Sequence, residues 1–231
     1  MNNESITVLS IGGSLVVPAQ GIDVDFLHNL NAFIRYNVAH NRRFLLVIGG
    51  GKTTRFYQDA AKAVSGNITP DDVDWIGIHA TRLNAHLVRT IFKDIAHPRI
   101  IENYDHKLEN WQEAVVVGAG WKPGWSTDYC AVTLAKDYKA KTIINMTNVY
   151  YIYDKDPNIY SDARKFESIK WPQLQKIVGH TWIPGSNVPF DPIATKLASD
   201  LGLQVIITHG ENFKNIQQIL DGKKFKGTLI S

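Results

Sequence analysis

Short apolar runs recur along the chain, and each of them ends in glycine or in polar residues. They cover residues 6–11, 44–48, 114–117, 142–146 and 204–208. Their length and unbroken apolar character are typical of strands buried on both faces. Between them lie segments such as residues 25–40, where apolar residues recur every three or four positions, as in a helix. The alternation predicts an α/β fold, a three-layer αβα sandwich around a mainly parallel central sheet, with ligands at the carboxyl ends of the strands.

Proline and aspartate mark the starts of two further helices. Pro70 and the two aspartates after it open a predicted helix to about residue 92, and Asp191 is an N-cap before Pro192 in a helix to about residue 201. The remaining expected elements are a helix from about 126–128, a helix at 212–220, a β excursion at 149–153 and a closing strand at 227–230. We expect a single domain over residues 1–231, with a soft division near residue 140.

Three of the predicted strands end in loops rich in glycine. These loops are residues 12–14, 49–52 and 118–124. Without a Cβ, the backbone N–H groups of glycine can approach an anion closely, and the positive end of a following helix adds to the attraction. A tight turn also uses glycine, but three such loops at one sheet edge favour a site for several phosphates. Two common fingerprints are absent, because Leu46 replaces a P-loop glycine and Pro123 replaces the third glycine of a dinucleotide site.

Composition narrows the function classes. The net charge is +3 and the Lys and Arg residues are dispersed, which favours a small anionic ligand over nucleic acid. No apolar run approaches the roughly 20 residues of a membrane span, and the N-terminus lacks the features of a signal peptide, so we expect a cytoplasmic protein. Cys130 is the only cysteine, which excludes an internal disulfide, and the eight histidines show no HExxH spacing. We therefore expect no transition metal bound by the protein.

Seven ordered motifs resemble those of the amino-acid kinases. They are Ile11-Gly12-Gly13-Ser14, Gly49-Gly50-Gly51-Lys52 with Arg55, residues 74–78 with 81–85, residues 123–128, Thr147-Asn148-Val149 with Tyr153 and Asp156-Pro157, residues 191–196, and residues 227–230. Within that family, the chain length and the block at residues 74–78 are similar to archaeal uridylate (UMP) kinases. The resemblance implies a carbamate-kinase-like fold, with an acceptor-binding lobe at about residues 1–140 and an ATP-binding lobe at about residues 141–231.

The resemblance also implies an activity. ATP would give its γ-phosphoryl group to UMP, which forms UDP and ADP in pyrimidine nucleotide synthesis. Asp128, Lys196 and Arg55 would be catalytic, because phosphoryl transfer depends on positioning and charge stabilisation. Mg2+ would arrive with ATP, held largely by phosphates and water. The partners implied are ATP, UMP and further copies of the chain in a homohexamer, without nucleic acid or membrane.

Two sets of contact residues follow from the same resemblance. Those implied to bind ATP are Ser10, Ile11, Gly12, Gly13, Ser14, Gly51, Arg55, Thr147, Tyr153 and Asp156. Those implied to bind the acceptor are Gly50, Asp74, Trp121, Lys122, Pro123, Gly124, Trp125, Ser126 and Thr127. The charged candidates also have ordinary structural explanations. Lys196 is spaced to pair with Asp200 on a helix surface, and Asp74 and Asp128 stand where a carboxylate offsets a helix dipole.

The chain departs from the family pattern at three places. Ser10 stands where many bacterial relatives have lysine, a loss that archaeal forms share. Trp121 and Trp125 replace the usual Thr and His of the acceptor loop, and Tyr150-Tyr151 replaces the common Asp-Gly. These changes leave two alternatives open. One is a related kinase for another nucleoside monophosphate, isopentenyl phosphate, carbamate or an amino acid, and the other is a non-catalytic nucleotide-binding or storage protein.

Overall fold

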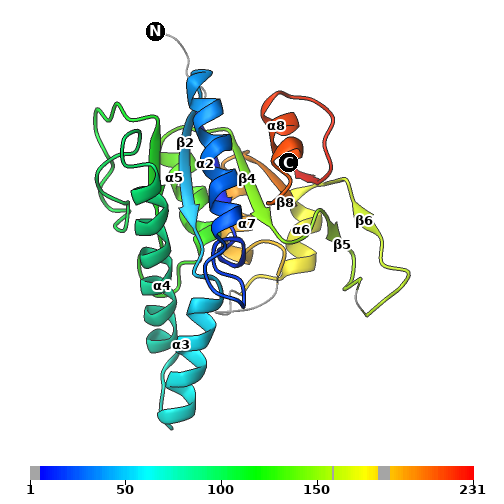
Figure 1. Cartoon of the computed structure of the whole chain (residues 1–231). Helices are drawn as coiled ribbons and strands as arrows, with labels where there is room; N and C mark the ends of the chain where they lie inside the picture. The colour runs from blue at the N-terminus through cyan, green and yellow to red at the C-terminus, as the bar shows by residue number, and fades with distance from the viewer. Residues whose placement is uncertain (1–5, 158, 182–187) are drawn as a thin grey trace.

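A seven-stranded sheet forms the centre of the protein. The computed structural model describes residues 6–157, 159–181 and 188–231. The strands of the sheet are β1 (Ile6–Ile11), β2 (Arg43–Ile48), β3 (Val115–Gly118), β4 (Thr142–Thr147), β7 (Ser168–Ile169), β8 (Gln204–His209) and β9 (Thr228–Ile230). Their order is β3-β2-β1-β4-β8-β9-β7. All neighbours are parallel except β8 and β9, which are antiparallel. A short hairpin of β5 (Ile152–Tyr153) and β6 (Lys165–Phe166) lies outside the sheet (Figure 1).

Eight helices surround the sheet in the described part of the chain. They are α1 (Gly13–Val16), α2 (Val24–Ala39), α3 (Gly51–Val64), α4 (Pro70–Ile91), α5 (Thr127–Asp137), α6 (Trp171–Val178), α7 (Pro192–Asp200) and α8 (Phe213–Leu220). Side chains cap most of them. Asp23, Ser126, Asp191 and Asn212 each accept a backbone N–H in the first turn of the following helix. Thr69 and Asp72 form a reciprocal capping box at the start of α4.

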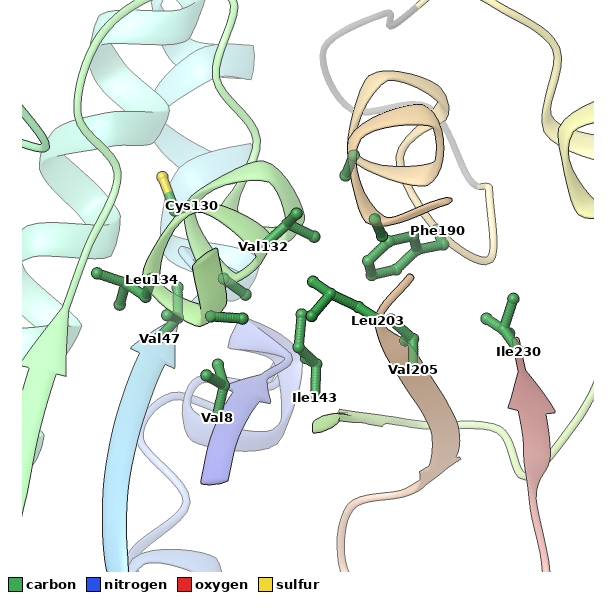
Figure 2. Packing of buried hydrophobic residues seen from close by; sticks show 14 of the residues in the cluster. Val8, Val47, Cys130, Val132, Leu134, Ile143, Phe190, Leu203, Val205 and Ile230 are labelled. Carbon is green, nitrogen blue, oxygen red and sulfur yellow. The ribbon is translucent and has the colours of Figure 1, made fainter. Parts of the chain in front are cut away.

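Hydrophobic clusters cover both faces of the sheet. Val8 and Leu9, neighbours on β1, are both fully buried and belong to opposite clusters, as expected when successive side chains point to opposite faces. One cluster packs the sheet against α5 and α7, where Cys130 and Phe190 contribute, as Figure 2 shows. The other packs it against α2, α4 and α8. This double burial explains the uninterrupted apolar runs and confirms the predicted three-layer α/β fold.

The predicted elements are present, with small shifts of their ends. The helix predicted from residue 70 to about 92 is α4, and the β excursion contributes only β5. Four elements differ from the expected set, namely α1, α6, β6 and β7. The division of the chain near residue 140 stays a prediction. None of the helices in the described ranges is long and apolar enough to cross a membrane.

Helices α3 and α4 pack along each other and extend beyond the sheet, next to the carboxyl end of β2 (Figure 1). None of the side chains of α3 is fully buried. Val64 at its end is 90% exposed, and Phe56 and Tyr57 are also exposed. The two helices therefore form an arm that projects from the sheet. Residues of this arm line one side of a cleft at the strand ends.

Candidate active site

A cleft of about 320 Å³ opens at the carboxyl ends of the parallel strands. It lies where the loops after β1, β2 and β3 meet the first turns of α3 and α5 and the inner face of α4. Its walls are formed by Gly13, Gly49, Gly50, Gly51, Thr54, Arg55, Gln58, Asp74, Gly77, Ile78, Thr81, Gly120, Trp125, Ser126, Thr127, Asp128, Val188 and Asp191. Residues as far apart in the sequence as Gly13 and Asp191 thus share one cavity, as expected at the strand ends of an open α/β sheet.

The glycine loops after β1 and β2 touch through their backbones. A Cβ on Gly13 would lie 2.0 Å from the backbone nitrogen of Gly51, and Gly51 has a φ of +64°, in the left-handed region. Two hydrogen bonds fix the loops to the sheet, from Gly12 N–H to the Met146 carbonyl at 2.8 Å and from Gly49 N–H to the Ile11 carbonyl at 3.0 Å. Both loops therefore need glycine for packing as well as for access to a ligand.

Helix N-termini converge on this cavity. Gly13 and Gly51 begin α1 and α3, Thr127 begins α5, and Asp191 caps α7, and all four residues line the cleft. The N–H groups at a helix start lack partners within the helix and carry partial positive charge. Arg55, in the first turns of α3, is the only cationic side chain among the described residues that line the cleft. Such a cavity is suited to several phosphate groups.

Two carboxyl groups lie together on the cleft. Asp128 Oδ2 accepts the backbone N–H of Asp191 at 3.1 Å, and Asp128 Oδ1 accepts the Asn145 amide at 3.3 Å. Loss of hydration inside the protein raises the pKa of Asp128 to about 7, despite these hydrogen bonds, and the neighbouring Asp191 adds to the rise. Burial also raises the pKa of Asp191, although Asp191 caps α7 by accepting the N–H groups of Ile193 and Ala194. Asp128 therefore changes charge near neutral pH.

The part of the cleft wall formed by the loop at residues 120–125 is aromatic. Trp125 faces the cleft and packs edge-on against Trp121, with ring centroids 4.6 Å apart, and against Tyr129 at 4.5 Å. Tyr104 lies against both tryptophans. The Lys122 ammonium sits 3.7 Å from the centre of the Trp121 ring. The Trp125 indole is thus held by three rings and presents a fixed apolar surface.

Asp74 connects this aromatic loop to α4. Asp74 Oδ2 accepts the backbone N–H of Gly124 at 2.9 Å. Burial raises the pKa of Asp74, and the hydrogen bond from Gly124 opposes that rise. Gly124 has a φ of +84°, which favours glycine at this turn. The carboxyl group is therefore both part of the cleft wall and a fastening point of the loop.

The structure brings nine of the predicted site residues onto the cleft wall. They are Gly13, Gly50, Gly51, Arg55, Asp74, Trp125, Ser126, Thr127 and Asp128. Neighbours of these residues are not part of the wall, namely Ser10 and Ile11 at the end of β1, Gly12 and Ser14 beside Gly13, and Trp121, Lys122, Pro123 and Gly124 on the aromatic loop. The other three residues implied to bind ATP lie elsewhere, with Thr147 at the end of β4, Tyr153 in β5 and Asp156 in the hairpin loop.

Lys196 is not brought into the cleft. Its ammonium pairs with Asp200 at 2.9 Å on the surface of α7, and its side chain is 69% exposed. It borders a different hollow, together with Tyr129, Gln175 and His180. Of the three catalytic candidates, Asp128 and Arg55 therefore line the cleft and Lys196 does not.

Sequence reasoning missed several residues of the cleft. Asp191 was assigned only as a helix cap, and that assignment is correct, but the same carboxyl group also lines the cavity. Thr54 lines it one turn into α3, and its buried hydroxyl has no hydrogen-bond partner among the described residues. The signal for Thr54 was its position four residues after Gly50, which places it above the glycine loop on the helix that the loop begins.

Known proteins share this organisation over nearly the whole chain. The sequence model of the amino acid kinase family matches residues 5–209. The uridylate kinase of Thermoplasma volcanium is 34% identical over 99% of this chain and 98% of its own length, and that of Methanococcus aeolicus is 31% identical over 97% and 98%.

Solved structures agree. The uridylate kinase of Archaeoglobus fulgidus has a TM-score of 0.81 and 31% identity, covering 97% of this chain and 99% of its own. The aspartate kinase of Synechocystis, at 18% identity and a TM-score of 0.70 over 98% of this chain and 39% of its own, shares the fold. Because the family model matches most of the chain and these relatives match nearly its full length, the chain belongs to the amino acid kinase family.

Proposed function

We propose that the protein is an ATP-dependent uridylate kinase, which phosphorylates UMP to UDP in pyrimidine nucleotide synthesis. One observation carries the proposal: the glycine loops after β1 and β2 share a single cleft with Asp74 and Trp125. The chain is also similar along nearly its full length to archaeal proteins named uridylate kinase. The relatives do not favour the other acceptors or a storage role.

The glycine side of the cleft would hold the reacting phosphates. Gly13, Ser14 and Gly51 would donate N–H groups to ATP, and Gly50 would face the phosphate of UMP. Gly12, whose N–H is bonded to the Met146 carbonyl, would hold this loop against the sheet. An oxygen of the UMP α-phosphate forms a bond to the γ-phosphorus while the bond from that phosphorus to the β–γ bridging oxygen breaks, which gives UDP and ADP. Arg55 would contact the migrating group through its planar fork. Fixed donors aimed at these oxygens stabilise the transition state.

The residues present also suit a magnesium ion that enters with ATP. Asp128 and Asp191 offer carboxylate oxygens on the cleft wall, the ligand type that Mg2+ prefers. The described residues contain no group of three or more His, Cys, Asp or Glu able to hold an ion by themselves, so phosphates and water would supply most ligands. When bound, the ion neutralises phosphate charge. Asp128 would orient its water ligands.

The tryptophan side would hold the nucleoside of UMP. Asp74 would accept hydrogen bonds from the ribose hydroxyls. Trp125 would support the base, and the hydroxyls of Ser126 and Thr127 would contact base or phosphate. Trp121, Lys122, Pro123 and Gly124 would shape the loop around the acceptor. Ser10 and Ile11 would line the approach of ATP.

The adenosine part of ATP would bind beyond the cleft. Thr147 ends β4, the neighbour of β1, and Tyr153 and Asp156 follow in the hairpin region. A donor site along this part of the sheet edge would leave the cleft free for the acceptor. ATP and UMP would then meet at the glycine loops with their phosphates facing each other.

The test of the activity couples ADP release to a panel of acceptors with Mg-ATP. UMP is expected to give the largest kcat/KM, ahead of CMP, AMP, isopentenyl phosphate, carbamate and amino acids. Stimulation by another acceptor but not by UMP would contradict the substrate and keep the kinase. ATP binding by calorimetry without turnover on any acceptor would contradict the enzyme.

Lys196 is the proposed catalytic residue that needs its own test. Its role requires the ammonium to leave Asp200 and enter the cleft when substrates bind. Lys196→Ala is then expected to lower kcat by about 100-fold, whereas Asp200→Ala, which frees the lysine, should leave kcat within about twofold. Equal and small effects of both substitutions would remove Lys196 from the catalytic set.

A homohexamer is part of the same proposal. The exposed side chains Phe56, Tyr57, Val64 and Leu83 on the α3–α4 arm are suited to subunit contacts. Light scattering is expected to give about six times the mass of the 25.9 kDa chain. A cytoplasmic location remains a prediction from the sequence.

A further inference from the structure

One face of α4 holds two of the three loops that line the cleft, those after β2 and β3. Asn84 donates its amide to the carbonyls of Gly49 and Gly50, at 2.9 and 3.1 Å, and so holds the glycine loop. Asp74, at the other end of this face, accepts the N–H of Gly124 in the aromatic loop. Because ten residues of helix span about 15 Å, α4 sets the distance between the two loops.

The base of the aromatic loop is held by two adjacent residues of α4. The Thr81 hydroxyl accepts the N–H of Gly120 at 2.8 Å and donates to the Ile78 carbonyl at 2.6 Å. Arg82 donates Nε to the Gly120 carbonyl at 3.2 Å and Nη2 to the Trp121 carbonyl at 2.9 Å. All hydrogen-bonding groups of the Gly120 backbone are therefore bonded to α4.

Arg82 itself is kept in place by a third segment. Its Nη2 also donates to the Glu102 carbonyl at 3.3 Å, and its Nε lies 3.4 Å from the Glu102 carboxylate. The Arg82 side chain is not part of the cleft wall. A planar guanidinium with several donors can bond two consecutive carbonyls in a fixed direction, which a lysine ammonium cannot do.

From these contacts we infer that Arg82 is a positioning residue for the phosphate acceptor. It fixes the backbone at residues 120–121, from which the Trp121 side chain extends, and the edge-on packing of Trp121 against Trp125 passes that position to the cleft wall. Arg82 acts through the loop and touches neither substrate. The inference rests on the proposed function, since it assigns the aromatic wall to the acceptor.

The kinetic test compares Arg82→Met and Arg82→Lys with the wild type. Arg82→Met is expected to raise the KM for UMP by about 10-fold and leave the KM for ATP within about twofold, because only the acceptor wall shifts. The KM for UMP of Arg82→Lys should lie between those of the wild type and Arg82→Met, because lysine keeps the positive charge but lacks the planar guanidinium. Arg35→Met is the matched control. Arg35 likewise bonds a carbonyl and a carboxylate, those of Ile91 and Asp94, outside the cleft, so both KM values should stay within about twofold.

A second readout does not require turnover. Coupling between the Trp121 and Trp125 rings contributes to the near-ultraviolet circular dichroism, and Trp121→Phe gives the spectrum without it. Arg82→Met is expected to shift towards that spectrum, while Arg35→Met keeps the wild-type signal. If Arg82→Met does not fold, Thr81→Val and Thr81→Ser replace it, with the hydroxyl of serine restoring both the spectrum and the KM for UMP.

The outcomes separate the two proposals. Failure of the wild type to use UMP would contradict the proposed function, and the spectra would still decide whether Arg82 sets the loop. A folded Arg82→Met protein with unchanged UMP KM and an unchanged spectrum would overturn the inference. Equal increases of both KM values in proportion to lost thermal stability would also overturn it, because they would indicate a general structural role.

Discussion

One wall of the cleft consists of backbone, and the other consists of side chains. The wall formed by the loops after β1 and β2 is backbone, with Gly13 and Gly51 in direct contact. The wall formed by residues 120–125 is made of aromatic side chains supported by α4. A backbone wall accepts almost no substitution, whereas a side-chain wall can change and still pack. The comparison teaches that substitution can reshape the aromatic wall while the backbone wall stays constant, which under the proposed function would change the acceptor and keep the phosphate site.

The most severe way to break the backbone wall is Gly13→Ala. The new methyl would overlap the backbone of Gly51 and Gly49, so the loops must separate. We expect kcat/KM to fall by a factor on the order of 100 or more, because the phosphate donors lose their alignment. Steady-state assays and thermal unfolding measure the two effects. Gly66→Ala is the control, since a Cβ there meets nothing within 4 Å and activity should be unchanged.

The acidic pair between the walls gives a pH-dependent effect. The pKa of Asp128 is raised to about 7, so between about pH 4 and 7 the folded protein binds a proton that the unfolded chain has lost. The free energy of unfolding should therefore fall as pH rises, by up to about 1.4 kcal/mol per pH unit, and level off above about pH 7. Urea unfolding of the wild type and of Asp128→Asn at about pH 5 and pH 8 measures it. A wild-type slope no steeper than that of the variant would contradict the assignment, because only Asp191 would then contribute.

The role of the side-chain wall is tested by replacing its central ring, Trp125. Trp125→Leu removes the indole that faces the cleft and is expected to raise the KM for UMP about 10-fold, or about 1.4 kcal/mol. The KM for ATP should stay within about twofold, since the glycine loops are untouched. Trp111→Leu is a control, because Trp111 stacks with Arg43, packs edge-on against Tyr138 and lies outside the cleft. A rise in both KM values for Trp125→Leu would mean that the two walls are not independent.

The smallest expected effect belongs to Lys122. Its ammonium covers Trp121 at 3.7 Å, an exposed contact that stabilises by about 0.5–1 kcal/mol. Lys122→Met should keep the apolar stem over the ring, with less than about a threefold change in the KM for UMP. A change of tenfold or more, relieved at high salt, would instead assign the lysine to the phosphate of the acceptor.

Most of the fold was predictable because it depends on local signals. The apolar run at residues 44–48 and the glycines after it correctly predicted β2 and the loop that begins α3. The strands β6 and β7 have two residues each, which is too short to show the alternation of apolar and polar side chains that predicts a strand. β7 forms only because it pairs with β9, far along the chain, and no local pattern contains that partner.

The candidate site divides in the same way. Parallel strands brought Gly13 and Gly50 together as their positions at strand ends predict. The motif that contains Lys196 does not predict which way its side chain points. Ala194 and Ala198 are fully buried, and a residue two positions from each lies about 200° around the helix, towards solvent. The face of α7 that is buried depends on its packing against α5 and α6, which the motif alone cannot specify.

The contact between Gly13 and Gly51 has a consequence for local unfolding. No side chain lies between the two segments, so neither can detach from the sheet without releasing the other. Their amides should therefore exchange with deuterium as one cooperative unit, with Gly12 and Gly49, which both donate to strand carbonyls, opening at the same rate. The two segments are far apart in the sequence, but they should fluctuate together because neither carries a side chain at the contact.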